Sequence, residues 1–367
     1  MDFSPLPLIP AFSERLLLET WILQTIVSRC EFFSMVYTLS DFDYDLPEKL
    51  IAQEPSRPRD HSRLLVYDRQ SGLITDDFFY HLAHYLPDQS TLVVNNSKVE
   101  KCRLLFDDGS MEIFVLNTLN DRTVEALVRP GKKFKEGETI QLASGIEAEV
   151  LSIADDGIRT LLLNRPLDDS AYDPFRATPF PPYIEQNESL SDEYQTVYAQ
   201  QSGSKAAPTA GLHFTDHLIE DLKKKGYGWE EITLHVGLGT FAPVKTENID
   251  EHTMHSEWYR LGEETADRLN QAEHITAVGT TSVRVLESAL NTHRRFSPAS
   301  GETDIFITPG YRFKAVDSLI TNFHLPKSTL LMLVAAFMGY DEMRRVYRHA
   351  IHEEYRFYSF GDGMLIV

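Results

Sequence analysis

The sequence is poor in cysteine and in positive charge. Only two of its 367 residues are cysteines, Cys30 and Cys102, which excludes a disulfide scaffold and favours a reducing compartment, the cytoplasm. Lysine and arginine number 35 against 55 aspartates and glutamates, so the formal net charge is −20. Such acidity excludes indiscriminate binding to nucleic acid, because phosphates would be repelled over most of the surface. Any nucleic-acid contact must therefore come from a local cluster of cations.

Long apolar runs are also missing. The first 34 residues contain LPLIPAF and LLLETWILQTIV, which are broken by prolines and by Glu19. Neither has the form of a signal peptide, and neither reaches the roughly 20 apolar residues that cross a bilayer. We therefore expect no membrane partner. We interpret residues 1–34 as an extension ahead of a natural start at Met35; the alternative is an extra helix packed on the domain.

The rest of the chain shows two different patterns of apolar and polar residues. In residues 35–99 and 176–367, apolar runs such as RLLVYD, STLVVNN and HITAV alternate with helical patterns such as FTDHLIEDLKKK and SVRVLESALN. This alternation predicts a large α/β domain with a mixed sheet and helices. In residues 100–175, five short runs are separated by Asp-Gly, Pro-Gly and Ser-Gly. They predict an inserted small all-β barrel domain.

Two loops of the second half are rich in small residues. GSKAAPTAGLHF presents Thr209 and His213 beside residues that let a ligand approach the backbone; its alternative is a tight interdomain loop. In TLHVGLGTF, a strand is followed by four residues that could bind a flat ring such as adenine; the alternative is a β-bulge without a ligand. These four are Gly237, Gly239, Thr240 and Phe241.

The segment VGTTSVRVLES predicts a strand that ends at Gly279 and leads into a helix. The residues Thr280, Thr281 and Ser282 then stand at the helix N-terminus, where free N–H groups and hydroxyls suit a carboxylate or another anion. Arg284 falls in the predicted first turn, where a cation opposes the helix dipole. Capping explains Ser282 but not Arg284, so we expect Arg284 to bind a carboxylate or a phosphate.

Histidines are the remaining candidates. The spacing of His252, His255 and Glu257 in HTMHSE resembles a metal-ligand pattern. Further ligands could come from His213, His235 and His324. The sequence lacks H-E-x-x-H and C-x-x-C, so hydrogen-bonded site histidines are favoured over metal ligands. TNFHLPKS places Asn322 and His324 in a polar turn before a capped apolar helix.

Taken together, these segments resemble the S-adenosylmethionine:tRNA ribosyltransferase-isomerase family of queuosine biosynthesis. The matching stretches run in order from Met35 to the C-terminus. They are DFDYDLPEKLIAQEP, RDHSRLL, LVVNNSKV, PPYI, YQTVYA, AAPTAGLHF, TLHVGLGTF, HTMHSE, VGTTSVRVLES, TNFHLPKSTLLMLV and YRFYSFGDGM. Two features depart from the family pattern. VEKCRLLFDDGSMEIF is shorter and more acidic than the basic loop usual there, and residues 1–34 have no counterpart.

The resemblance implies a cytoplasmic monomer that needs no metal and no cofactor. It implies that S-adenosylmethionine is a consumed co-substrate whose ribosyl group is transferred and isomerised, with release of adenine and methionine. The acceptor is tRNA carrying 7-aminomethyl-7-deazaguanine at the wobble position, and the product is epoxyqueuosine-tRNA. The rival readings are a metal-dependent hydrolase built on the histidines and a binding module without catalysis.

For this reaction we hypothesise His213 or His255 as the general base and His235 or another nearby donor as the group that protonates adenine, with His324 in the same site. Arg284 and the turn Thr280–Ser282 would hold the methionine carboxylate. For tRNA the best cluster is VRPGKKFK, against the alternative of a solvated face; its cations are Arg129, Lys132, Lys133 and Lys135. Two other basic groups, Lys223–Lys225 and the arginines 344, 345 and 348, are weaker candidates.

Overall fold

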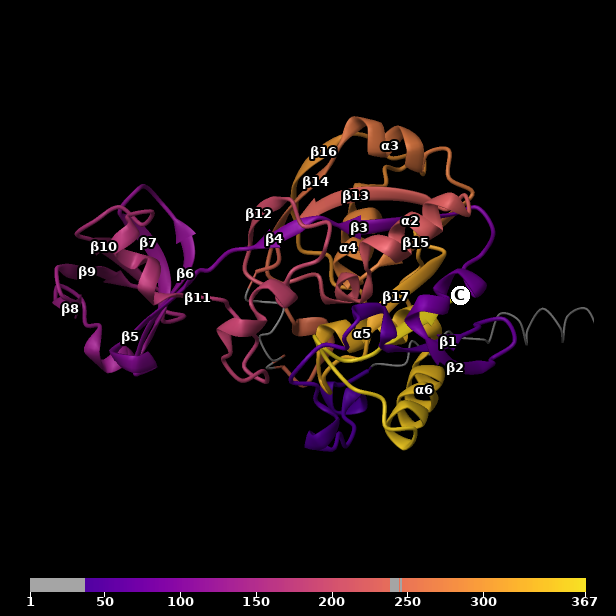
Figure 1. The fold of residues 1–367 in the computed structure, drawn as a ribbon, viewed down its shortest axis with the longest axis horizontal. Coiled ribbons are helices and arrows are strands. Elements are labelled where there is room, and N and C mark those ends of the chain that lie inside the picture. Colours follow the sequence, from indigo (N-terminus) through magenta and orange to yellow (C-terminus); the bar gives the residue numbers. More distant parts are fainter. Residues whose placement is uncertain (1–36, 238–243, 245) are drawn as a thin grey trace, which may run out of the picture. The chain divides into compact units, whose positions relative to one another are not determined.

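The computed structural model describes residues 37–237, 244 and 246–367 (Figure 1). The expectations for residues 1–34, including Cys30, lie outside the described residues. So do three of the residues expected to accept a flat ring, namely Gly239, Thr240 and Phe241.

A nine-stranded mixed sheet forms the centre of the α/β part (Figure 1). Its strand order is β16-β14-β13-β3-β15-β17-β18-β1-β2. The bounds are β1 Arg63–Tyr67, β2 Ile74–Phe78, β3 Ser90–Asn95, β13 Gly228–Leu234, β14 Glu257–Leu261, β15 His274–Val278, β16 Ala299–Thr303, β17 Ser318–Asn322 and β18 Gly363–Ile366. Parallel pairs join β13 to β3, β3 to β15, β15 to β17 and β18 to β1, and the other neighbours are antiparallel. The predicted mixed sheet is confirmed.

Five α-helices accompany this sheet in the described chain. They are α2 Asp216–Lys224, α3 Glu263–Leu269, α4 Thr280–Ala289, α5 Thr329–Met338 and α6 Tyr340–His352. Both α2 and α5 have a side-chain N-cap: the hydroxyl of Thr215 accepts from the backbone N–H of Leu218 at 3.1 Å, and that of Ser328 accepts from the backbone N–H of Leu331 at 3.2 Å. The apolar helix α5 is buried along most of its length. These helices are all too short or too polar to traverse a bilayer.

A second, seven-stranded antiparallel sheet is built from residues 103–177. Its order is β11-β5-β6-β7-β10-β9-β8. Its strands are β5 Arg103–Phe106, β6 Met111–Thr118, β7 Thr123–Arg129, β8 Thr139–Ala143, β9 Ile146–Ile153, β10 Arg159–Leu163 and β11 Arg176–Ala177. Each of the five runs expected to be strands is one. The sheet buries an apolar core of its own, in which Phe106, Ile113, Val124, Phe134 and Leu161 are fully buried. β11 lies just beyond residue 175, where the sequence places the end of the insertion.

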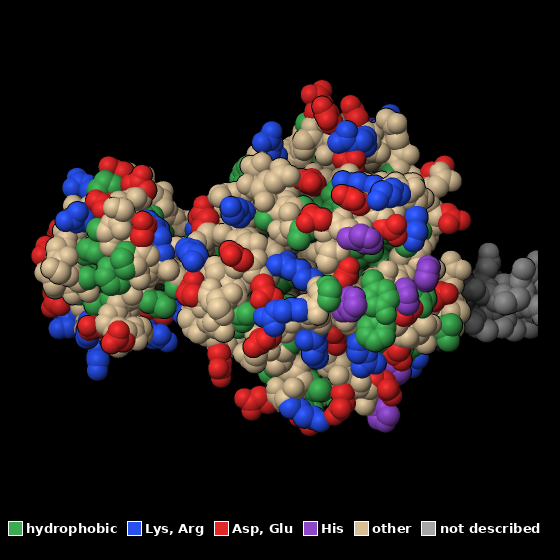
Figure 2. Space-filling view, in the orientation of Figure 1, with side chains coloured by type: hydrophobic (Ala, Val, Ile, Leu, Met, Phe, Trp, Pro, Cys, Tyr) green, Lys and Arg blue, Asp and Glu red, His purple; other side chains and the backbone are tan. Residues whose placement is uncertain are grey.

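Charged side chains of both signs are interspersed over the face drawn in Figure 2. Many cations there and elsewhere are paired with carboxylates, as Arg57 is with Glu193 at 2.8 Å and Arg345 with Glu342 at 2.6 Å. Because such pairing neutralises basic side chains locally, an anionic partner must find cations that have no carboxylate beside them.

Candidate functional site

A cavity of about 70 Å³ that opens to solvent lies at the carboxyl edge of the large sheet. β15 and β17 are parallel neighbours, so the residues that follow or end them, Gly279 and Asn322, meet at one edge, which is the usual ligand position in open α/β sheets. Six residues selected from the sequence line this cavity: Thr209, Gly279, Thr280, Thr281, Asn322 and His324. They come from three separate motifs, and the fold brings them together.

The N-terminus of α4 forms one wall of the cavity. Gly279 adopts a φ of +89°, a left-handed conformation that favours glycine, and its turn aims the first residues of the helix at the cavity. The hydroxyl of Thr281 is buried and has no hydrogen-bond partner among the described residues. Ser282 instead donates to the carbonyl of Val278 at 2.7 Å. Free helix N–H groups beside an unused hydroxyl suit a carboxylate.

The structure gives Arg284 other partners than the ligand expected from the sequence. It is the fifth residue of α4, a position beyond the first turn, and does not line the cavity. Its buried guanidinium pairs with Glu257 and donates to the carbonyls of Thr303 at 3.2 Å and Ile305 at 3.3 Å. Glu257 also accepts from the backbone N–H of Gly237 at 2.8 Å. An internal ion pair therefore explains a cation in this position.

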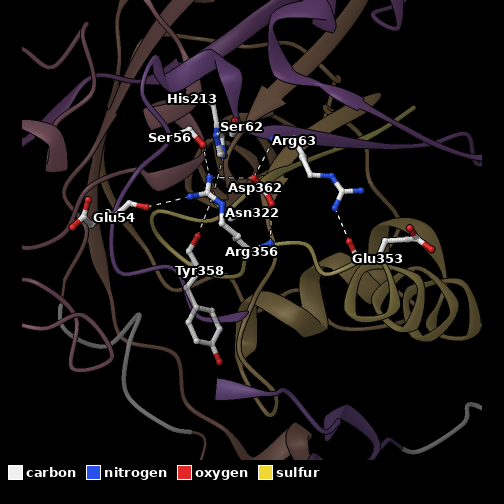
Figure 3. A network of polar contacts seen from close by, with 10 residues as sticks. All are labelled: Glu54, Ser56, Ser62, Arg63, His213, Asn322, Glu353, Arg356, Tyr358 and Asp362. Atoms are coloured by element: carbon white, nitrogen blue, oxygen red, sulfur yellow. Dashed lines mark hydrogen bonds and ion pairs between the residues drawn. The ribbon is translucent and has the colours of Figure 1, made fainter. Parts of the chain in front are cut away.

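His213 lies behind the cavity wall. Its ring stacks on that of Phe79, with the two centroids 4.8 Å apart. Both ring nitrogens have a side-chain partner: Nδ1 lies 2.8 Å from the Oγ atom of Ser62, and Nε2 lies 3.1 Å from the Nδ2 atom of Asn322 (Figure 3). Burial, together with the charges of Arg356 and Arg59, lowers the pKa of His213 to about 3. The ring is therefore neutral at physiological pH.

His324 is the candidate histidine that lines the cavity itself. Its Nε2 lies 2.8 Å from the hydroxyl of Thr321, while its backbone N–H donates to the hydroxyl of Tyr347 at 3.0 Å. Burial lowers the pKa of His324 to about 3. The ring is therefore neutral at physiological pH, and a neutral imidazole at a cavity wall can donate or accept a hydrogen bond.

The two other candidate histidines do not line this cavity. His235 lies beyond the end of β13 with its ring stacked on Trp258 at a centroid distance of 4.9 Å. Burial lowers the pKa of His235, and its Nδ1 has no partner in the described part of the chain. His255 is exposed to solvent. Within the residues that the structure describes, no group of three or more histidines, cysteines or carboxylates is arranged to hold a metal ion.

An aromatic wall of the cavity was not predicted from the sequence. Tyr183 and Tyr358 line it with rings 4.6 Å apart, and the hydroxyl of Tyr183 lies 2.9 Å from that of Ser359. Both belong to stretches that carried the family resemblance, PPYI and YRFYSFGDGM, and that resemblance was the one available signal. Tyr358 has a φ of +72°, which is rare for a bulky residue and common at sites that bind ligands.

The basic cluster expected to contact tRNA lies at the end of β7. Arg129 pairs with Glu112 at 3.3 Å and Lys135 with Glu138 at 3.5 Å. Lys132 and Lys133 are exposed on a 3₁₀ turn, Gly131–Lys133, and form no ion pair within the described chain. These two lysines are therefore the cations of the cluster that are free to meet a phosphate.

Fold and cavity together are those of an α/β protein with a cavity at the carboxyl edge of its sheet. The sequence pattern of the queuosine biosynthesis protein family matches residues 39–366, and the chain belongs to this family.

Individual relatives agree. The chain is 47% identical over 339 residues to the S-adenosylmethionine:tRNA ribosyltransferase-isomerase of Desulfitobacterium hafniense, covering 90% of this chain and 99% of the relative. It is 48% identical over 337 residues to the protein of the same name from Carboxydothermus hydrogenoformans, with the same coverage. The crystal structure of S-adenosylmethionine tRNA ribosyltransferase from Thermotoga maritima is similar with a TM-score of 0.51 and 40% identity, covering 89% of this chain and all of that one.

The two buried neutral histidines predict a pH-dependent stability. The pKa of each is about 3 in the folded protein and about 6.5 in an unfolded chain. Below pH 6.5 the unfolded state therefore binds protons that the folded state does not, so stability is complete above pH 6.5 and falls as the pH drops toward 3. At pH 5 each histidine should lower the free energy of unfolding by about 2 kcal/mol relative to pH 7.

Urea unfolding at pH 7 and pH 5 measures this loss. In His213→Gln and His324→Gln, the loss of unfolding free energy between pH 7 and pH 5 should be smaller by the contribution of the replaced histidine. An unchanged difference in both variants would show that these rings do not stay neutral in the fold.

Proposed function

We propose that this chain transfers the ribosyl group of S-adenosylmethionine to 7-aminomethyl-7-deazaguanine at the tRNA wobble position and isomerises it. The products are epoxyqueuosine-tRNA, adenine and methionine. The observation that carries this proposal is 47% identity over 90% of the chain to an S-adenosylmethionine:tRNA ribosyltransferase-isomerase. The cavity supports it, because a carboxylate cradle, a neutral histidine and an aromatic wall suit the parts of S-adenosylmethionine.

The substrate dictates what the site must do. The sulfonium of S-adenosylmethionine acidifies the adjacent C5′ protons, so a base removes one of them and adenine is expelled. The aminomethyl nitrogen of the tRNA base then attacks, and epoxide closure releases methionine. These steps need a base, a donor to the departing adenine, and protection from water. S-adenosylmethionine is consumed as a co-substrate, and the proposed reaction uses no metal and no further cofactor.

The N-terminus of α4 is the proposed seat of the methionine carboxylate. Thr280 and Thr281 present helix N–H groups, and the buried Thr281 hydroxyl has no partner in the described residues. A carboxylate there meets the positive end of the helix dipole. Arg284 supports this wall through its ion pair with Glu257.

His324 is the proposed proton-transfer group of the site. Among the histidines selected from the sequence it alone lines the cavity of the described chain, whereas His213 lies behind Asn322 and His255 is exposed. The hydroxyl of Thr321, 2.8 Å from Nε2, would set which ring nitrogen carries the proton.

Residues 100–175 are the proposed inserted β-barrel domain, and the turn after β7 is its tRNA contact. Lys132 and Lys133 are exposed cations without a carboxylate partner in the described chain. Since the formal net charge is −20, a few such cations would provide the phosphate contacts. A cytoplasmic monomer completes the proposal.

The decisive assay is the release of adenine from S-adenosylmethionine. Adenine should appear only when tRNA bearing the aminomethyl base is added, at an unchanged rate after chelator treatment, as followed by chromatography. Unmodified tRNA is the matched control. Loss of activity with the chelator, restored by metal, would favour the rival metal-dependent hydrolase.

Replacement of His324 tests the proton-transfer role. His324→Gln should lower kcat by about 100-fold or more, because a positioned acid or base contributes on that order. S-adenosylmethionine affinity, measured by calorimetry without tRNA, should change little. His217→Ala, at an exposed histidine of α2, is the control for loss of an imidazole. A near-normal kcat in His324→Gln would reject the assignment.

Charge reversal tests the tRNA contact. Lys132→Glu with Lys133→Glu should raise the tRNA KM by about tenfold or more and flatten its salt dependence, since each lost phosphate contact removes about 0.7–0.9 from the logarithmic slope. The same change at Lys224 and Lys225 is the control, because these lysines already pair with Glu220 at 3.6 Å and Asp221 at 3.1 Å. Equal effects of the two pairs would place the contact elsewhere.

A further inference from the structure

The side-chain oxygen of Asn322, a residue that lines the cavity, is a hydrogen-bond acceptor without a donor among the described residues. The residue ends β17, is 2% exposed, and lines the cavity, yet its Oδ1 has no hydrogen-bond partner among the described residues. Leaving a buried carbonyl oxygen unpaired costs about 1–3 kcal/mol. Such a group beside an open cavity is explained when a ligand supplies the missing donor.

The orientation of the Asn322 amide follows from its neighbours. The side-chain atom that lies 3.1 Å from the backbone carbonyl of Tyr358 must be the nitrogen, because a carbonyl can only accept (Figure 3). The other amide hydrogen points to Nε2 of His213, also at 3.1 Å. Both donors are then used inside the protein, and Oδ1 is the polar atom left for the cavity.

His213 is held so that its Nε2 accepts a hydrogen bond from the Asn322 amide. Since its Nε2 accepts from Asn322, its proton is on Nδ1, which donates to Oγ of Ser62 at 2.8 Å. Phe79 stacks on the ring, and even a Cβ added at Gly363 would come within 3.5 Å of Nε2. The neutral state described above keeps Nε2 an acceptor at all physiological pH values.

The segment that supplies the Tyr358 carbonyl is fixed by a second set of contacts. Asp362 is buried and accepts from the backbone N–H groups of Arg63 at 3.0 Å and Arg356 at 2.8 Å, and from the Arg356 side chain at 3.2 Å (Figure 3). Arg63 follows Ser62 directly in the chain. One carboxylate therefore ties together the two segments that orient His213 and Asn322.

We propose that Asn322 presents Oδ1 as a hydrogen-bond acceptor to an N–H donor of the substrates, and that His213 is the positioning residue that fixes this orientation. The inference rests on the proposed function, whose substrates offer two such donors: the amino group of adenine and the aminomethyl group of the tRNA base. His213 thereby acts through Asn322 and not as the general base considered from the sequence.

A double-mutant cycle tests the proposal in the full-length enzyme. Asn322→Ala should raise one KM by about tenfold, the value of one hydrogen bond, and the substrate affected identifies the donor. His213→Phe keeps a stacked ring but removes the acceptor, so it should raise the same KM by about threefold to tenfold. The double variant should be no worse than Asn322→Ala alone, because the two residues act as one unit.

Rescue and the pH profile separate positioning from base catalysis. His213→Gln offers a carbonyl oxygen in place of Nε2 and should recover most of the lost affinity, and the pH dependence of kcat/KM should keep its wild-type shape. If kcat collapses in both His213→Gln and His213→Phe with KM unchanged, or if the two single effects multiply in the double variant, the inference is overturned.

Two controls make the outcome readable. Circular dichroism melts show whether each variant is folded. If His213→Phe unfolds, Asn322→Ala and His213→Gln still test the inference, because Asn322→Ala should raise KM and His213→Gln should leave KM near the wild-type value. Wild-type enzyme that releases no adenine would overturn the proposed function itself. Normal wild-type turnover with unchanged KM values in Asn322→Ala would overturn this inference alone.

Discussion

The parallel pairing of β15 with β17 is the constraint on which the site depends. The register that sets Val278 opposite Ile320 fixes where each strand ends, and the chain leaves the sheet at Gly279 and after Asn322 on the same edge. One exit becomes the N-terminus of α4 and the other the turn that carries His324. Neither exit alone encloses a space, but their adjacency forms a cavity with a helix N-terminus on one wall and an amide oxygen on another.

Local sequence signals were sufficient for the elements that build this edge. The N-caps of α2 and α5, the break at Gly279 and the strands of the second sheet are each specified within a few residues, through hydroxyls, glycine and apolar alternation. Six of the chosen site residues accordingly line the cavity.

The roles of the site side chains were harder to predict because they depend on distant partners. Arg284 is satisfied by Glu257, 27 positions earlier, and His213 by Ser62, 151 positions earlier. No periodicity or spacing encodes such contacts. From the sequence we therefore expected Arg284 to bind a ligand, whereas in the structure it pairs with the carboxylate of Glu257. The sequence also offered no role for Tyr183 and Tyr358, which line the cavity.

The order of the large sheet also has a consequence for biosynthesis of the protein. β1, the first strand of the described chain, lies beside β18, the last one described, and β18 separates β1 from β17. Until β18 has emerged from the ribosome, β1 and β17 each lack a neighbour, and the Asp362 anchor has not yet been made. The sheet can thus be completed only after β18 has been synthesised, and until then a nascent chain must keep two apolar strand edges from pairing wrongly.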